Sequence, residues 1–211
     1  MSLSASYDRL KQVGFDPQTI LDIGAFCGNW TRFTQSVFPR ASYTMIEANN
    51  HPQLESVGAT LIREVVSSCI GPVQWWSNGG TGDSILRERT RHYATVVPST
   101  RMATTLDTLF PDKTFDFIKI DCQGTELDIL KGGKALVDRA TVLLLECPFA
   151  GQYNEGCPSF CEYIQYMDSN GFAPFDISEI HMIGNVMGQI DILFVRKGVY
   201  TDQIQRIIST H

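Results

Sequence analysis

The sequence predicts an α/β fold with a mostly parallel, seven-stranded sheet, an antiparallel last strand and helices on both faces. Three observations predict it. Short apolar runs alternate with helical patterns, a glycine turn follows the first apolar run, and acids end several runs. The last two runs, 172–177 and 190–195, have no long helix between them, so we expect the final strand to be antiparallel.

The first half of the chain begins with a short amphipathic helix and then a buried strand. Gly24 and Gly28 bracket a tight loop after that strand. The helix that follows has Phe26, Trp30 and Phe33 on one predicted face, together with Val37. The elements expected here are a helix over 6–13, a strand over 19–23, a helix over 29–37, and strands over 42–46, 60–66 and 73–77.

The second half returns to regular alternation after an irregular stretch around 67–104. Thr125 and Asp128 have the spacing of a capping box, and Gly132 and Gly133 should interrupt the helix that follows. The expected elements are strands over 115–120 and 141–145, helices over 125–137 and 159–169, the last two strands, and a weak helix over 200–208.

Length and composition limit the function classes. A chain of 211 residues without a linker or repeat indicates a single domain over 1–211. The net charge of -6 argues against a nucleic-acid partner. No apolar segment is long enough for a membrane span, and the first residues do not resemble a signal peptide. The six cysteines form no CxxC pair, so we expect reduced thiols and a cytoplasmic location.

The glycine turn after the first strand indicates a small-ligand site. A dinucleotide usually requires GxGxxG, but Phe26 stands where the middle glycine should be. The acid Asp22 also disfavours a pyrophosphate. S-adenosylmethionine suits the turn better, because it has no phosphate and carries a sulfonium and an ammonium group. Glu47 ends the next strand, where a carboxylate can accept hydrogen bonds from both ribose hydroxyls.

Four acids end neighbouring strands of the predicted sheet. In open parallel sheets, ligands bind outside the carboxyl ends of the strands. The sequence therefore predicts a ligand site at the edge that carries these four acids, which are Asp22, Glu47, Asp121 and Glu146.

Several longer motifs carry a resemblance to a known family. They are ILDIGAFCGNW (20–30), YTMIEAN (43–49), FDFIKIDCQGTELDILKGG (115–133), LLLECP, NGF (170–172) and GQIDILFVRK (188–197). On these motifs the chain resembles the FkbM family of S-adenosylmethionine-dependent methyltransferases. One position departs from the family pattern, since Gln123 stands where the family usually has Glu.

The resemblance implies a Rossmann-like class I methyltransferase fold and methylation of a hydroxyl on a sugar, glycan or small natural product. Asp121 is the first candidate for the methyl-transfer site, with binding of the cofactor's ammonium group as its alternative role. Glu146 would orient the acceptor, and His181 would close over the pocket from a loop before the last strand. The expected cofactor-binding residues are Asp22, Gly24, Ala25, Gly28, Asn29, Glu47, Ala48, Ser67, Asp121 and Gln123.

Three alternatives stay open at this stage. Asp121 and Glu146 could hold a divalent metal, but this is not favoured because the sequence shows no second ligand cluster. The same turn could serve a NAD-type nucleotide-dependent oxidoreductase. The departure at Gln123 leaves room for a binding module that has the fold without catalysis.

Overall fold

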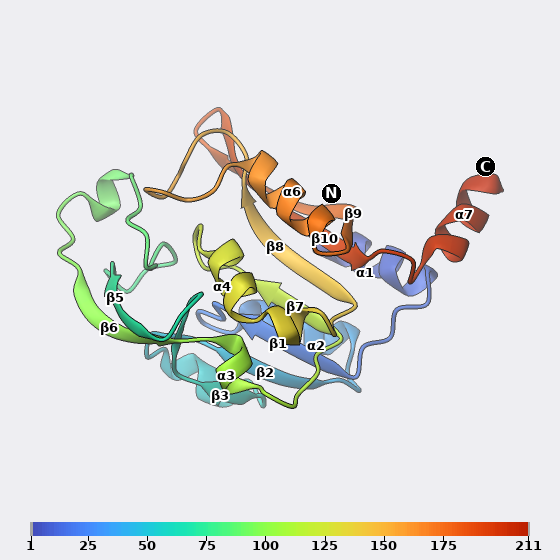
Figure 1. Cartoon of the computed structure of the whole chain (residues 1–211), viewed down its shortest axis with the longest axis horizontal. Helices are drawn as coiled ribbons and strands as arrows, with labels where there is room; N and C mark the ends of the chain where they lie inside the picture. The colour runs from blue at the N-terminus through green and yellow to red at the C-terminus, as the bar shows by residue number, and fades with distance from the viewer. Residues whose placement is uncertain (1, 211) are drawn as a thin grey trace.

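A seven-stranded sheet forms the centre of the computed structural model, which describes residues 2–210 (Figure 1). The strand order is β3-β2-β1-β7-β8-β10-β9, and β10 is antiparallel to both of its neighbours. The remaining adjacent pairs are parallel, so the predicted fold class is confirmed. The strands are β1 Thr19–Ile23, β2 Ser42–Ile46, β3 Thr60–Ile62, β7 Phe117–Ile120, β8 Val142–Pro148, β9 Phe172–Ile183 and β10 Val186–Arg196.

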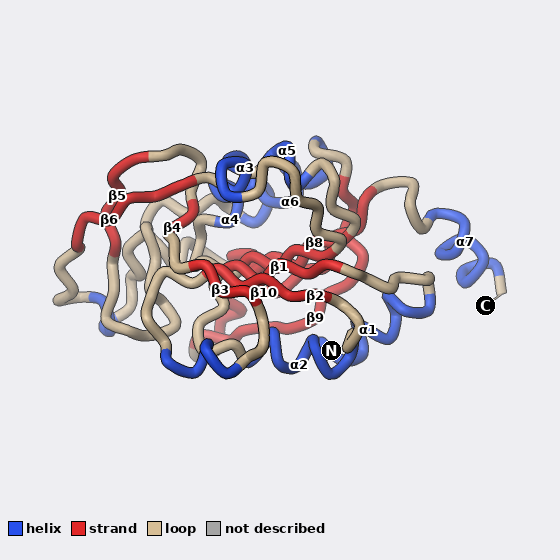
Figure 2. The backbone as a smooth tube through the Cα atoms, turned by 90° about the horizontal axis from the view of Figure 1, so that it is seen from below, coloured by secondary structure: helices blue, strands red, loops and turns tan. Residues whose placement is uncertain are grey.

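Helices cover both faces of the sheet (Figure 2). One face carries α3 to α6, and the other carries α1 and α2. The last helix, α7, projects from the body and buries none of its residues. The helices are α1 Leu3–Gln12, α2 Asn29–Val37, α3 Leu106–Leu109, α4 Glu126–Gly132, α5 Lys134–Val137, α6 Phe160–Ser169 and α7 Thr201–Ser209.

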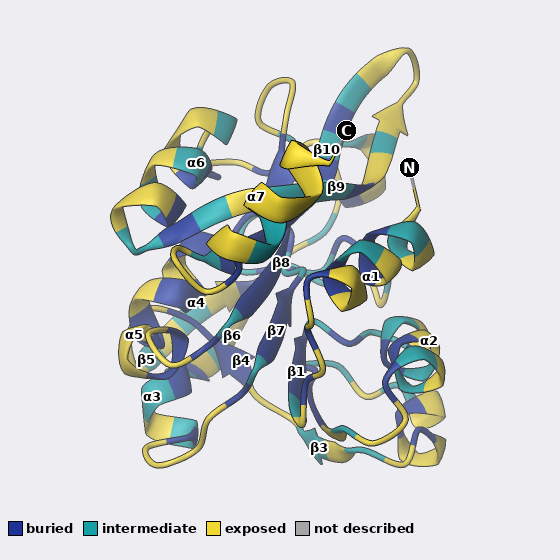
Figure 3. Cartoon of the chain, turned by 90° about the vertical axis from the view of Figure 1, so that its right-hand side faces the viewer, coloured by how far each residue is buried: buried dark blue, intermediate teal, exposed yellow. Residues whose placement is uncertain are grey.

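The apolar core divides into two layers, one on each side of the sheet. Central strands are buried on both faces and therefore read as continuous apolar runs, as in β8 (Figure 3). Leu127, Leu136 and Tyr163 belong to the layer under α4 to α6. Tyr7 and Leu10 of α1 belong to the opposite layer, where aromatic rings pack against Phe117.

A second, three-stranded sheet lies beside the main one. It consists of β4 Val65–Val66, β5 Gly71–Trp75 and β6 Ser99–Thr104, in the order β4-β6-β5. The prediction of a single strand over 60–66 is therefore wrong. The exposed Arg63 and Glu64 separate β3 from β4, and β4 pairs with β6. The added strand expected at 73–77 is β5, which begins earlier and ends at Trp75.

Two details of the helices differ from the predictions. The inner face of α2 carries Thr31 and Thr34, and Phe33 is exposed. Buried hydroxyls are tolerated there because each has a partner: Thr31 donates to Asp22, and Thr34 lies 3.0 Å from the Tyr7 hydroxyl.

The expected capping box at Thr125 and Asp128 is also wrong. The Thr125 hydroxyl donates to the carbonyl of Cys122 instead, and the side chain makes no cap hydrogen bond. A capping box occurs at α6, between Ser159 and Glu162. The helix expected over 125–137 is interrupted at Gly133, which separates α4 from α5.

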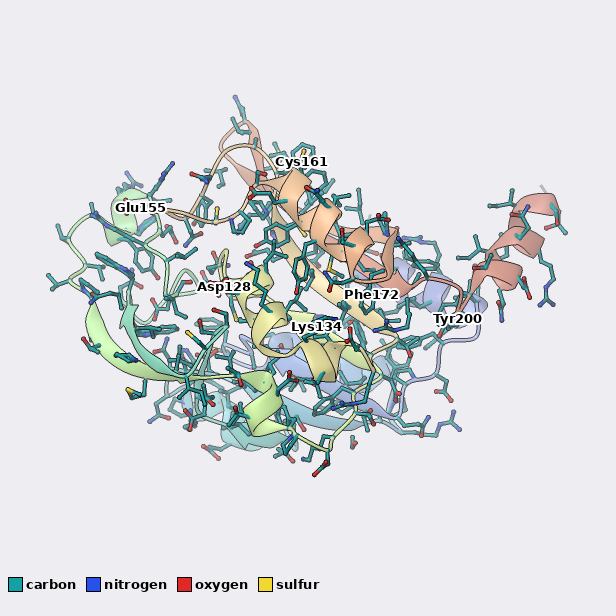
Figure 4. The ribbon with its side chains drawn as sticks, viewed as in Figure 1. Asp128, Lys134, Glu155, Cys161, Phe172 and Tyr200 are labelled. Carbon is teal, nitrogen blue, oxygen red and sulfur yellow. The ribbon has the colours of Figure 1, made fainter. Side chains whose placement is uncertain are left out.

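The segment between β8 and α6 contacts the region that follows β5. Glu155 is labelled in this segment in Figure 4, and its backbone N–H donates to the carbonyl of Arg87 at 2.8 Å. Glu88 and Asn154 also form an isolated β-bridge. Between residues 2 and 210, no helix has the length and apolar character that crossing a bilayer requires.

Candidate active site

A cavity of about 450 Å³ opens at the carboxyl ends of the parallel strands. This volume lies within the range of small-molecule sites. Among the predicted site residues, those that line the cavity are Gly24, Ala25, Asn29, Glu47, Ala48, Asp121, Gln123, Glu146 and His181. Asp22, Gly28 and Ser67 are placed outside its lining. Ser67 donates its backbone N–H to the carbonyl of Thr104, the last residue of β6.

The glycine turn has its shape because two backbones meet there. Gly24 has a φ of +76°, and a Cβ at this position would lie 1.9 Å from the carbonyl oxygen of Asp121. Gly28 has a φ of +78°, and a Cβ there would lie 2.7 Å from Val57. Side chains at either position would push the turn away from β7 or from the segment before β3.

A buried lysine joins the first turn to the end of β7. Lys119 Nζ lies 3.3 Å from Asp22 Oδ1, from Asp121 Oδ2 and from the carbonyl oxygen of Gly24. Burial alone would lower the pKa of Lys119, but Asp121 and Asp22 outweigh it and hold that pKa above its usual value. Asp22 also accepts a 2.5 Å hydrogen bond from Thr31. It therefore supports the turn from beneath, out of the cavity.

Glu47 holds the opposite side of the turn. Its two carboxylate oxygens accept 2.8 Å hydrogen bonds from the backbone N–H groups of Phe26 and Asn49. Each oxygen has a second lone pair available for a ribose hydroxyl. Beside it, the residues Ala48, Val65, Trp75 and Ile85 form an apolar cluster at the cavity. A carboxylate next to an apolar wall fits the ribose and adenine of S-adenosylmethionine.

Gln123 bridges two carboxylates in the middle of the cavity. Its amide nitrogen lies 3.3 Å from Asp121 Oδ1 and 2.8 Å from Glu146 Oε2. A carboxylate in its place could not donate to both. Burial, followed by the charge of Asp121, raises the pKa of Glu146 well above its usual value.

The loop that carries Gln123 is tethered by a second buried acid. Glu126 is fully buried and accepts hydrogen bonds from the backbone N–H groups of Cys122 and Gly124 and from the Tyr163 hydroxyl. Burial raises the pKa of Glu126 to about 7, and the hydrogen bonds act in the opposite direction. This tether keeps Gln123 in its left-handed conformation, at a φ of 56°.

His181 lies on strand β9, so its predicted place in a loop is wrong. Both β9 and β10 extend further than the runs 172–177 and 190–195 indicate. His181 Nε2 lies 3.3 Å from Asp191 Oδ1 on β10. The hydrogen bond with Asp191 raises the pKa of His181, and burial raises the pKa of Asp191.

Among the cavity residues that sequence reasoning missed, Lys119 and Asp191 contact predicted site residues directly. Lys119 interrupts the apolar strand FIKI, and a charged residue inside a fully buried strand is a signal that could have found it. Asp191 follows the alternating pattern of QIDIL, so nothing local distinguishes it from a solvent-facing residue.

The sheet order, the glycine turn and the acid at the end of β2 together are those of a class I methyltransferase fold. A family model described as the methyltransferase FkbM domain matches residues 22–174. The chain belongs to this family. The expected S-adenosylmethionine cofactor is confirmed with it, and the NAD-type alternative is set aside.

Solved structures give the same fold at low sequence identity. The magnesium protoporphyrin IX methyltransferase of Synechocystis PCC 6803, with bound S-adenosylhomocysteine, is 12% identical with a TM-score of 0.54, covering 92% of this chain and 81% of that one. A Burkholderia thailandensis 1,6-didemethyltoxoflavin N1-methyltransferase is 11% identical with a TM-score of 0.52, covering 92% and 77%. No match was found among curated proteins.

Proposed function

We propose that the chain methylates a hydroxyl group of a small molecule, such as a sugar, a glycan or a natural product. One observation carries this proposal: Gln123 holds the carboxylates of Asp121 and Glu146 together in the cavity that Glu47 also lines. An alcohol is a poor nucleophile until its proton leaves, and a positioned base contributes ~10²–10⁴-fold. Paired carboxylates beside the donor site supply such a base.

The donor half of the cavity is formed by the turn after β1 and the end of β2. Glu47 would accept hydrogen bonds from the ribose hydroxyls, and Ala48 lies in the apolar wall beside it. The backbone N–H of Asn29, at the first position of α2, would meet the carboxylate of the methionine part, whereas the N–H of Ala25 donates to the carbonyl of Ile46 and holds the turn. When bound, the cofactor supplies a methyl group already activated on sulfur. Bound S-adenosylhomocysteine in fold neighbours supports this assignment.

The acceptor half is formed by the ends of β7 and β8 and by the β9–β10 pair. Asp121 would take the hydroxyl proton as the new oxygen–carbon bond forms and the carbon–sulfur bond breaks. Glu146 would orient the acceptor, and His181 would border it from β9. Alignment of the reacting atoms can lower the barrier by ~7–11 kcal/mol.

The charge of the cavity further limits the acceptor. Seven carboxylates line it, against one lysine and one histidine; they are Glu47, Glu64, Asp83, Asp121, Glu146, Glu179 and Asp191. We therefore expect a neutral or cationic acceptor and no nucleic acid. We also propose a cytoplasmic location, which the six unpaired cysteines support.

The test separates donor binding from the choice of acceptor atom. S-adenosylhomocysteine binding is measured by calorimetry. Methyl transfer is then measured with one scaffold presented as an alcohol, an amine or a thiol. We expect transfer to the alcohol, and transfer to the amine alone would contradict the proposal. Binding of S-adenosylhomocysteine without methyl transfer to any of the three acceptors would favour the binding module that has the fold without catalysis.

A variant pair tests the role of Asp121. Asp121→Asn should lower kcat by at least ~10²-fold, because the amide cannot accept the proton. The matched control is Asp128→Asn, at an exposed aspartate on α4. Turnover of Asp121→Asn within twofold of this control would show that the base lies elsewhere.

A further inference from the structure

Three adjacent strands bring a histidine and two carboxylates together at the acceptor end of the cavity. Glu146 lies on β8, Asp191 on β10 and His181 on β9. These three strands are neighbours in the sheet (Figure 1). One potential ligand atom from each residue lies within 4.8 Å of the other two. Three ligand atoms that share an ion at ~2.0–2.1 Å, with neighbouring ligands at right angles, are ~2.9 Å apart, so the three side chains would have to close around the ion as it binds.

The sheet register shows that this cluster is more than an accidental grouping of surface acids. Asp191 is directly opposite Glu146 on one side and directly opposite Glu179 on the other. Like charges directly opposite each other destabilise a sheet. Glu146 is buried and Asp191 is half-buried, so water screens their repulsion poorly. A cation between them would remove this repulsion.

The protein itself supplies little positive charge at this place. Lys119 is the only lysine or arginine among the described residues that line the cavity. Its ion pairs are with Asp22 and Asp121. His181 is the remaining titratable cation of the lining, and it belongs to the cluster.

We propose that Glu146, His181 and Asp191 bind a divalent cation of the Mn²⁺ or Mg²⁺ class, which holds the acceptor hydroxyl. Two carboxylates and one imidazole form an oxygen-rich donor set, which favours these ions over those that prefer thiolates. Three protein ligands leave coordination positions for water and for the acceptor. His181 is partly exposed, with 41% of its side chain accessible, so the ion has a path into the site.

The neighbouring residues suit this arrangement. Gln123 donates to Oε2 of Glu146, and a hydrogen-bonded ligand carboxylate keeps its orientation. The bound ion would lower the pKa of the acceptor hydroxyl, and Asp121 would then accept the proton. Only this role rests on the proposed function, since ion binding itself does not require a methyl acceptor.

The test uses the full chain, freed of metal by a chelator, with Mn²⁺ as the probe. Mn²⁺ binding is measured by calorimetry and by the loss of the free-ion electron paramagnetic resonance signal, without cofactor or acceptor. We expect one Mn²⁺ per chain. Asp191→Asn and His181→Gln should each weaken binding at least ~10-fold. Glu179→Gln is the matched control. It removes the same charge from the same row of acids without removing a ligand, and should weaken binding less than ~3-fold.

Two outcomes would overturn the proposal. One is the absence of stoichiometric Mn²⁺ binding to the wild-type chain. The other is equal weakening by all three substitutions, because that would indicate a diffuse negative surface. If the first outcome occurs, and methyl transfer to an aminated acceptor depends on Asp191, then the acids bind an ammonium group of the acceptor instead of a metal ion.

Parallel titrations with S-adenosylhomocysteine separate this proposal from the proposed function. Retained binding in the variants shows that they are folded. If the wild-type chain does not bind S-adenosylhomocysteine, the proposed function is refuted, and the result of the Mn²⁺ titration is unaffected.

Discussion

Replacing the buried lysine should destabilise the protein strongly. Lys119→Met removes the cation that lies 3.3 Å from Asp22, a side chain that is only 1% exposed. Asp22 would keep the hydroxyl of Thr31 but lose its counter-ion. Breaking a buried ion pair by removing one partner costs about 3–5 kcal/mol. For a domain of this size, 1 kcal/mol shifts Tm by ~2–4 °C, so the variant should melt ~6–20 °C lower.

The double variant Lys119→Met/Asp22→Asn makes the reasoning specific. Removing both charges should recover at least half of the loss, because asparagine still accepts from Thr31. Urea denaturation of the wild type, both single variants and the double variant gives the coupling energy. Lys131→Met, at an exposed lysine, is the control and should change the free energy of unfolding by less than ~0.5 kcal/mol. A loss below ~1 kcal/mol for Lys119→Met, or strictly additive losses, would refute the argument.

Three further outcomes are expected. Glu47→Ala should raise the Kd of S-adenosylhomocysteine ~10–100-fold, since hydrogen bonds to a charged acceptor contribute ~1.5–3 kcal/mol; unchanged calorimetric affinity would place the ribose elsewhere. Gln123→Glu should move the acidic limb of the pH profile of kcat to higher pH by about one unit, because a further carboxylate would contact Glu146. A profile at the same position as that of the wild type would show that Glu146 does not contribute to this limb. The pKa of Glu126 is raised from 4.5 to about 7, so the folded state retains this proton where the unfolded state has released it. Stability should therefore fall by about 3 kcal/mol between about pH 4.5 and 7, and Glu126→Gln should lose that part of the slope in urea titrations; an equal slope in both would assign the effect to other acids.

The part of the fold that local patterns determine was predicted closely. Strands 19–23 and 42–46 and the helix over 29–37 have the observed bounds. Each is marked by a change of period; Gly24 follows the first strand, and Gly28 and Pro39 flank the helix. The ends of these strands also bring Glu47 and Asp121 to one cavity, as the parallel topology implies.

Features that depend on distant pairing were not predictable from local patterns. Val65–Val66 joins a second sheet because β6, more than thirty residues later along the chain, is available to pair with it. The contact of Asp191 with His181 depends on the register of two long strands, and that register shifts at three places. No pattern within either strand determines where such irregularities fall.

The two carboxylates that Gln123 connects have a consequence for how this enzyme could diversify. Asp121 and the turn after β1 are locked together by Lys119 and by backbone contact at Gly24, which leaves little freedom to alter that side. The β9–β10 pair joins the sheet along β8, the strand that carries Glu146, and its outer end carries exposed Met182, Ile183 and Val186. Substitutions confined to the β9–β10 pair could thus change the acceptor, while the residues around the methyl donor stay the same.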